Sequence, residues 1–150
     1  MLLTDHPPIL ETRTFSWPDE SACAAFAVRL ARAPSLFPST FIALAGPLGA
    51  GKTTFVRHLL RALGVQGRIK SPTYAVMEPY EIDGRAVSHF DFYRLESADE
   101  ALRFGLDDYL GESAILAIEW AGKFPALLPA STRWLRFRAG DGDQRTSELP

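Results

Sequence analysis

The sequence contains a single cysteine, Cys23, among its 150 residues. One cysteine cannot form an internal disulfide, and it excludes zinc sites built from several cysteines. No run of apolar residues approaches the roughly 20 residues that a membrane-spanning helix requires. Residues 1–11 also lack the basic stretch followed by an apolar core that marks a secretory signal. These absences predict a cytoplasmic protein that does not associate with a membrane.

Charge is nearly balanced over the whole chain but unevenly distributed along it. The chain has 16 Lys and Arg residues and 18 Asp and Glu residues, a net charge of 16 − 18 = −2. This net charge does not favour nucleic-acid binding. Residues 21–77 contain seven basic residues and no acidic one, whereas residues 78–119 contain eleven acidic and three basic residues. The two parts can simply attract each other across a folded surface. Alternatively, the basic part holds an anion site and the acidic part a metal-binding or partner-facing surface.

Length and composition fit one globular domain over residues 1–150. Hydrophobic residues make up 47% of the chain and charged residues 23%, as in ordinary folded proteins. The pattern predicts strands over 9–15, 40–45, 86–92 and 114–119, and helices over 16–33, 52–63, 97–104 and 105–110. It also predicts an extended segment over 71–81, which Asp83-Gly84 joins to the next strand, and a closing hairpin of 135–138 and 146–149. Alternating strands and helices indicate an α/β fold with a mixed, mostly parallel sheet flanked by helices.

A glycine-rich turn lies between the predicted strand at 40–45 and the predicted helix at 52–63. Its sequence, Gly-Pro-Leu-Gly-Ala-Gly-Lys-Thr at 46–53, fits the pattern G-x-x-x-x-G-K-[ST] at every fixed position. Glycines let backbone N–H groups point inward as an anion nest, and the helix N-terminus adds its positive end. Lys52 supplies a charge for the β- and γ-phosphates, and the Thr53 hydroxyl is a hard ligand for Mg²⁺.

The alternative is a structural turn with an incidental lysine, which the flanking strand and helix disfavour. The sequence therefore predicts a P-loop NTPase domain that binds a nucleoside triphosphate. The expected phosphate-binding residues are Gly46, Leu48, Gly49, Ala50, Gly51, Lys52, Thr53 and Thr54.

Two predicted strands end in an acidic residue. One ends at Asp91 and the other at Glu119. If both strands run parallel to the strand at 40–45, both carboxylates reach the same sheet edge as Lys52, where ligands bind in open α/β sheets. A role in holding a metal or positioning water is therefore favoured over a helix cap or a surface ion pair.

Three other residues have a possible functional role beside a structural one. Thr73, in Ser-Pro-Thr-Tyr at 71–74, can lie near the γ-phosphate as switch segments do, or can simply open a strand. His89 projects to the same face as Asp91, either as its hydrogen-bonded partner or as a core or surface histidine. Trp120 can belong to the core or to a docking surface, and Cys23 is expected to be a packing residue.

These motifs, in this order, resemble the TsaE family of small bacterial P-loop ATPases, which are required to make threonylcarbamoyladenosine in tRNA. The resemblance covers nearly the whole chain. It is carried by the Gly-x-x-Gly-Ala-Gly-Lys-Thr-Thr loop at 46–54, Ser-Pro-Thr-Tyr at 71–74, His-Phe-Asp-Phe-Tyr-Arg-Leu at 89–95, Gly-Leu-Asp-Asp-Tyr-Leu at 105–110 and Ile-Glu-Trp-Ala at 118–121.

The resemblance implies a role for each matched residue. Lys52 and the loop amides would hold the phosphates of ATP, and Thr53 and Glu119 would bind Mg²⁺. Asp91 would take the Walker B position, as a metal ligand and catalytic residue together with Lys52. Thr73 would belong to the switch-like segment and complete the catalytic set.

The resemblance also implies a further ATP-binding residue and protein partners. Arg145 matches a C-terminal basic position close to the nucleotide. The implied partners are TsaB and TsaD, of which TsaD transfers the threonylcarbamoyl group, while ATP hydrolysis by the TsaE-like protein resets the complex between turnovers. Contact with tRNA would then be indirect.

Two other hypotheses are compatible with the motifs. One is a P-loop small-molecule kinase that uses Asp91 to accept a hydroxyl proton, with Arg94 and Arg103 as phosphate clamps on a lid; no arginine-dense lid is evident in the sequence. The other is a nucleotide-gated binding module with negligible turnover. Both predict ATP binding, so turnover with and without added acceptor or partners separates them.

Overall fold

A computed structural model describes residues 13–32, 40–47, 50–70, 76–109, 114–139 and 145–149. Within these ranges, seven strands form one sheet in the order β1-β7-β6-β2-β5-β4-β3. The strands are β1 (Arg13–Trp17), β2 (Thr40–Ala45), β3 (Met77–Ile82), β4 (Arg85–Asp91), β5 (Ala114–Glu119), β6 (Arg133–Ala139) and β7 (Arg145–Leu149). The helices are α1 (Glu20–Ala31), α2 (Lys52–Leu63) and α3 (Ala98–Arg103), with short 3₁₀ helices η2 (Leu106–Tyr109), η3 (Ala121–Lys123) and η4 (Pro125–Leu127).

The centre of the sheet is parallel. β2 pairs in parallel with both β5 and β6, and β4 pairs in parallel with β5. At the margins, β7 is antiparallel to β6 and β1, and β3 is antiparallel to β4. Five of the seven described strands therefore run in the same direction, which confirms the predicted mixed, mostly parallel α/β fold.

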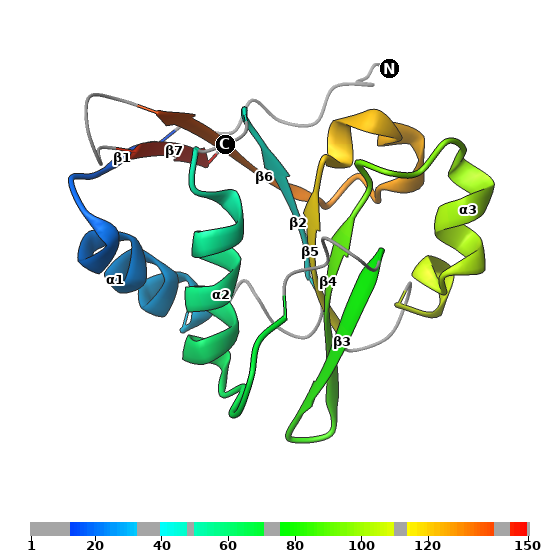
Figure 1. Ribbon diagram of the computed structural model, residues 1–150, viewed down its shortest axis with the longest axis horizontal. Coiled ribbons are helices and arrows are strands. Elements are labelled where there is room, and N and C mark those ends of the chain that lie inside the picture. Colours follow the sequence, from blue (N-terminus) through cyan, green and yellow to red (C-terminus); the bar gives the residue numbers. More distant parts are fainter. Residues whose placement is uncertain are drawn as a thin grey trace, which may run out of the picture.

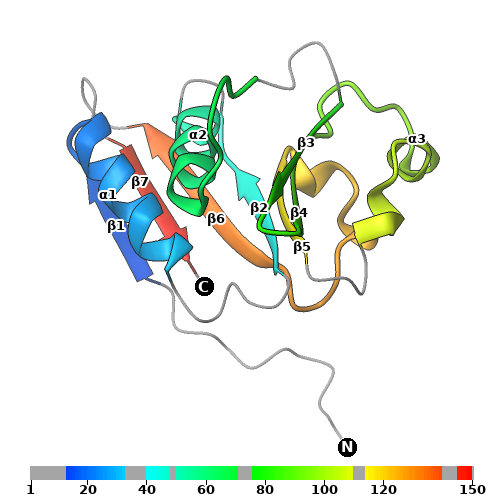
Figure 2. The same ribbon diagram turned by 90° about the horizontal axis from the view of Figure 1, so that it is seen from below.

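The central strands are buried on both faces, so alternate residues enter two separate cores. In β2, Ile42 and Leu44 pack with α1 and α2, whereas Phe41 and Ala43 pack with α3 and the 3₁₀ helices on the other face. Figure 1 shows α1 and α2 on one side of the sheet and α3 on the other. Figure 2 shows α1 and α2 side by side, with α1 over β1 and β7. This double burial explains why these strands read as continuous apolar runs.

The prediction that Ser16 starts the first helix is wrong. Ser16 lies in β1, where it pairs with Thr146 of β7. The helix begins at Glu20, and its N-cap is Asp19, whose side chain accepts a hydrogen bond of 2.9 Å from the backbone N–H of Ala22. The strand predicted over 9–15 is observed over 13–17; residues 9–12, like the predicted helix end at residue 33, lie outside the described residues.

Most other predicted elements are observed close to their expected bounds. Asp83 and Gly84 both have positive φ, 51° and 78°, as the tight turn between β3 and β4 requires. The helix predicted over 105–110 is a 3₁₀ turn, and the closing hairpin is formed by β6 and β7. In the described ranges, no helix has both the length and the apolar character needed to span a membrane.

Candidate functional site

The 46–53 loop joins the end of β2 to the start of α2. Gly46 has a φ of +143°, and a Cβ at this position would lie 2.6 Å from the carbonyl oxygen of Phe137 in β6. Gly51, at the N-cap of α2, has a φ of +100° and offers no side chain to the first turn. The first N–H groups of a helix have no partners within the helix, so this end of α2 is suited to an anion.

Lys52 is the first residue of α2, and its ammonium group is turned towards the strand ends. Nζ donates a hydrogen bond to the carbonyl oxygen of Gly46 and lies 4.3 Å from the ring centroid of Trp120. Burial lowers the pKa of Lys52 below its ordinary value, an effect opposed by the nearby carboxylates of Glu119 and Asp91. The lysine therefore occupies a partly dry position in which its charge acts strongly on any bound anion.

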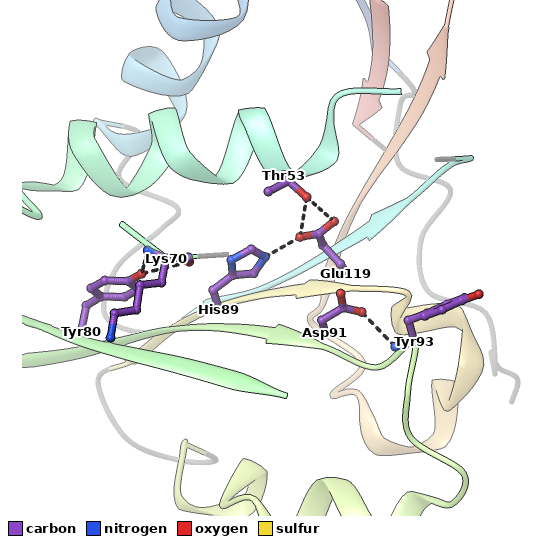
Figure 3. Close-up of polar contacts among 7 residues, drawn as sticks. All are labelled: Thr53, Lys70, Tyr80, His89, Asp91, Tyr93 and Glu119. Atoms are coloured by element: carbon purple, nitrogen blue, oxygen red, sulfur yellow. Dashed lines mark hydrogen bonds and ion pairs between the residues drawn. The ribbon is translucent and has the colours of Figure 1, made fainter. Parts of the chain in front are cut away.

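Thr53, His89 and Glu119 come from three elements and meet at one point (Figure 3). The hydroxyl of Thr53, on α2, lies 3.0 Å from Oε1 and 3.1 Å from Oε2 of Glu119, the last residue of β5. Nε2 of His89, on β4, lies 2.6 Å from Oε2 of the same carboxylate. His89 and Glu119 are only 1% and 4% exposed. The Thr53 hydroxyl, at the start of α2, thus faces the Glu119 carboxylate at the end of β5.

Asp91 lies beside this cluster. It is the residue opposite Glu119 in the parallel pairing of β4 and β5. Its Oδ1 accepts a hydrogen bond of 2.9 Å from the backbone N–H of Tyr93. Burial raises the pKa of Asp91 above its ordinary value; the Tyr93 hydrogen bond opposes this and the negative charge of Glu119 adds to it. The two carboxylates and Lys52 therefore share one sheet edge, as the strand ends predict.

A cavity of about 620 Å³ opens beside Lys52. Its walls are mostly apolar, and they come from the end of β2, the loop and the segment after β5. The ring centroids of Tyr93 and Trp120, which both line this cavity, are 5.0 Å apart. Nζ of Lys123 donates a hydrogen bond of 2.8 Å to the carbonyl oxygen of Tyr93. Trp120 is thus a half-buried wall of the cavity, and its backbone has a positive φ of 59°.

Several predicted site residues are only partly described. Leu48, Gly49 and Thr73 lie outside the described residues. The backbone of Arg145 pairs with Trp17 and Ala139 at the start of β7. The hydroxyl of Thr54 accepts a hydrogen bond of 3.4 Å from Arg57.

His89 has a partner that the sequence pattern did not identify. Of the roles left open for His89, pairing with Asp91 is not observed, since the Asp91 carboxylate accepts its hydrogen bond from the Tyr93 N–H. His89 is a core histidine, and its hydrogen bond goes to Glu119 on the neighbouring strand. Only the register of β4 against β5 brings these side chains together. Spacing along one strand could not reveal that.

The chain is similar to known proteins over most of its length. A family model described as Threonylcarbamoyl adenosine biosynthesis protein TsaE matches residues 17–147. The tRNA threonylcarbamoyladenosine biosynthesis protein TsaE of Haemophilus influenzae is 46% identical over 86 residues, which span 57% of this chain and only 54% of that protein. The Bacillus subtilis protein of the same name is 30% identical over 136 residues, 91% of this chain and 82% of that protein.

A solved structure has a similar fold. The crystal structure of Bacillus subtilis YdiB matches with a TM-score of 0.76 and 24% sequence identity, over 95% of this chain and 87% of that one. This likeness supports the arrangement of the sheet and helices independently of the site residues.

Proposed function

The chain belongs to the TsaE family of threonylcarbamoyl adenosine biosynthesis proteins, and from this premise we propose that it is an Mg²⁺-dependent ATPase. Its hydrolysis of ATP resets or regulates a complex of the partner proteins TsaB and TsaD, which make threonylcarbamoyladenosine in tRNA. Contact with tRNA passes through these partners.

The observation that carries the proposal is the meeting of the glycine-rich loop, Lys52, and the Thr53–Glu119 pair at one sheet edge. Thr53 follows Lys52 directly, and its hydroxyl lies 3.0 and 3.1 Å from the two carboxylate oxygens of Glu119. A phosphate chain and its metal need this combination of a nest, a cation and hard oxygen ligands. If the loop were only a structural turn, no contact between Thr53 and the buried carboxylate of Glu119 would be expected.

The residues present fit a magnesium ion. The Thr53 hydroxyl and the Glu119 carboxylate are oxygen donors of the kind that Mg²⁺ prefers, and Asp91 lies beside them. Over the described ranges, no group of three or more His, Cys, Asp or Glu side chains is arranged to hold a metal by itself. Mg²⁺ in nucleotide sites usually takes one or two protein ligands and completes its shell with phosphate oxygens and water. When bound, the ion supplies positive charge to the β- and γ-phosphates.

The chain's own groups account for the rest of the chemistry. Backbone N–H groups of the loop and of the first turn of α2 bind the phosphates, and Lys52 neutralises charge on the transferred group. Asp91, fixed by the Tyr93 N–H, accepts a hydrogen bond from the water that attacks the γ-phosphate in line. Thr73 and Arg145 complete the proposed catalytic and ATP-binding residues, respectively.

The test is phosphate release from ATP, measured for the protein alone, with TsaB and TsaD, and with a chelator. We expect slow hydrolysis alone, a rise with both partners, and none without Mg²⁺. Glu119→Ala should abolish turnover while nucleotide still binds without metal; Glu81→Ala, which removes an exposed carboxylate of β3, is the matched control. Lys52→Ala should abolish nucleotide binding, whereas Lys70→Ala, which removes an exposed lysine, should not.

Other outcomes would point to other functions. ATP consumption in proportion to an added hydroxyl acceptor would indicate the kinase alternative. ATP binding with no turnover in any combination would indicate a binding module. In cells, depletion of the protein should lower threonylcarbamoyladenosine in tRNA, measured by mass spectrometry of the nucleosides, and unchanged levels would contradict the proposal.

A further inference from the structure

His89 is a buried polar residue on β4, between β5 and the edge strand β3, and the proposed ATPase chemistry gives it no role. Its side chain is almost completely inaccessible, and so is that of Glu119. Nε2 of His89 lies 2.6 Å from Oε2 of Glu119. A carboxylate oxygen accepts hydrogen bonds, so Nε2 carries the hydrogen and donates it. A short bond of this kind to an ionised acceptor is among the stronger hydrogen bonds in proteins.

The contacts make the two oxygens of Glu119 unequal. Thr53 reaches both oxygens at nearly the same distance, 3.0 and 3.1 Å, and so does not select between them. His89 contacts only Oε2. In the view of Figure 3, the imidazole and the Thr53 hydroxyl approach the carboxylate from different sides. The histidine therefore holds Oε2 in place, and Oε1 is left with Thr53 as its only neighbour among these contacts.

We propose that His89 is a positioning residue for Glu119: its Nε2 hydrogen fixes the carboxylate so that one oxygen is presented, next to the Thr53 hydroxyl, to the divalent cation. This inference rests on the proposed function, because Glu119 needs positioning only if it serves a metal. A glutamate side chain has three rotatable bonds, and a buried partner on a rigid strand removes the freedom that metal binding would otherwise have to remove. Partners of this kind typically change metal affinity by about 10–100-fold.

The position of His89 in the fold supports this role. β4 is bounded by β3 and β5, so its backbone is held on both sides. His89 lies opposite Ala117, a small residue two positions before Glu119 on the same face of β5. The imidazole therefore has room to extend along β5 to the carboxylate. A histidine retained only for packing would not need a 2.6 Å contact with the one buried glutamate of the described core.

The experiment compares His89→Gln, His89→Asn and His89→Leu. The amide of glutamine places an N–H at about the position of Nε2, whereas the amide of asparagine is one methylene shorter and leucine has no donor. For each variant, Mn²⁺ affinity is measured by electron paramagnetic resonance on the protein loaded with ADP. Nucleotide affinity is measured separately by calorimetry with a chelator present.

We expect His89→Leu and His89→Asn to weaken Mn²⁺ binding about 10–100-fold. His89→Gln should recover most of the affinity, and chelator-treated nucleotide affinity should change by no more than about 3-fold in all three, since the phosphates are held elsewhere. Ser88→Ala is the structural control. Ser88 is on β4, like His89, and the substitution removes its part-buried hydrogen bond of 3.2 Å to the carbonyl oxygen of Glu78 on β3. It leaves the contacts of Glu119 in place and should leave Mn²⁺ affinity unchanged.

Two results would overturn the inference. One is wild-type Mn²⁺ affinity in His89→Leu and His89→Asn; the other is an equal loss in Gln, Asn and Ser88→Ala variants, which would indicate general destabilisation. If His89→Leu fails to fold, the comparison of Gln with Asn still decides. Failure of the proposed function has a different signature: the wild type would show no metal-dependent nucleotide binding, or Glu119→Ala would leave Mn²⁺ affinity unchanged, and the inference would fall with it.

Discussion

Replacing Gly46 with alanine tests how tightly the start of the phosphate-binding loop is held against β6. An alanine Cβ would lie 2.6 Å from the carbonyl oxygen of Phe137 and 3.0 Å from the Phe137 Cβ. The neighbouring atoms belong to a strand inside the sheet and cannot move aside as the end of a flexible side chain could. The φ of +143° also lies in a region that side-chain-bearing residues rarely adopt.

The magnitude follows from these two terms. An unfavourable backbone conformation costs about 1–3 kcal/mol, and overpacking of a tightly filled site costs about as much again. Gly46→Ala should therefore lower the free energy of unfolding by at least about 2 kcal/mol, or roughly 4–8 °C in melting temperature for a chain of this size. Because the loop begins at Gly46, the folded fraction should also bind nucleotide more weakly.

Two other glycines separate the cost of backbone strain from the cost of overpacking. Gly84 has a φ of +78° with no atom within 4 Å of an added Cβ, so Gly84→Ala carries backbone strain alone, about 1–2 kcal/mol. Gly122 is equally open and has no positive φ, so Gly122→Ala should stay within about 0.5 kcal/mol of the wild type. Urea unfolding, followed by circular dichroism, measures all three. The reasoning is refuted if Gly46→Ala is no less stable than Gly84→Ala.

Three further predictions concern stability and reactivity. Phe55 is fully buried among the rings of Trp17, Phe26 and Phe137, so Phe55→Ala should cost about 3–5 kcal/mol in urea unfolding; a loss as small as that of Phe104→Ala, at a 45% exposed position, would contradict this. Asp19→Ala removes the N-cap hydrogen bond of α1 and should cost about 1 kcal/mol, whereas Ser97→Ala should be nearly neutral because Ser97 makes no side-chain cap bond. Burial, together with the negative charge of Glu20, raises the pKa of the Cys23 thiol from 9.0 to about 11. Between these pH values the native state keeps a proton that the unfolded chain loses, so the free energy of unfolding should fall as pH rises from 9 towards 11. Cys23→Ala should abolish that part of the pH dependence in urea midpoints, and an identical pH profile in the variant would refute the assignment.

The elements that the sequence predicted well are those with local signals. The bounds of β2 and α2 follow from an apolar run, a glycine-rich turn and a closing Gly64, all of which lie next to the elements that they delimit. The adjacency of Asp91 and Glu119 could also be predicted, because the carboxyl ends of parallel strands share one edge of a sheet.

The features that the sequence did not reveal depend on contacts between distant segments. Ser16 has the side chain of a good N-cap, yet pairing with β7, more than a hundred residues later, keeps it in a strand. The contact between His89 and Glu119 depends on the register of two strands and on the rotamers of both side chains. The left-handed backbone of Trp120 has no sequence signal, since this conformation is rare in bulky residues.

A crystal structure of the protein with Mg²⁺ and a non-hydrolysable ATP analogue tests the central claim most directly. We expect the β-phosphate within the 46–53 loop, Lys52 turned from the Gly46 carbonyl to the phosphates, and Mg²⁺ about 2.0–2.1 Å from the Thr53 hydroxyl oxygen, with Glu119 in its coordination sphere directly or through one water. A nucleotide bound elsewhere on the protein, or a metal held by neither Thr53 nor Glu119, would contradict the account.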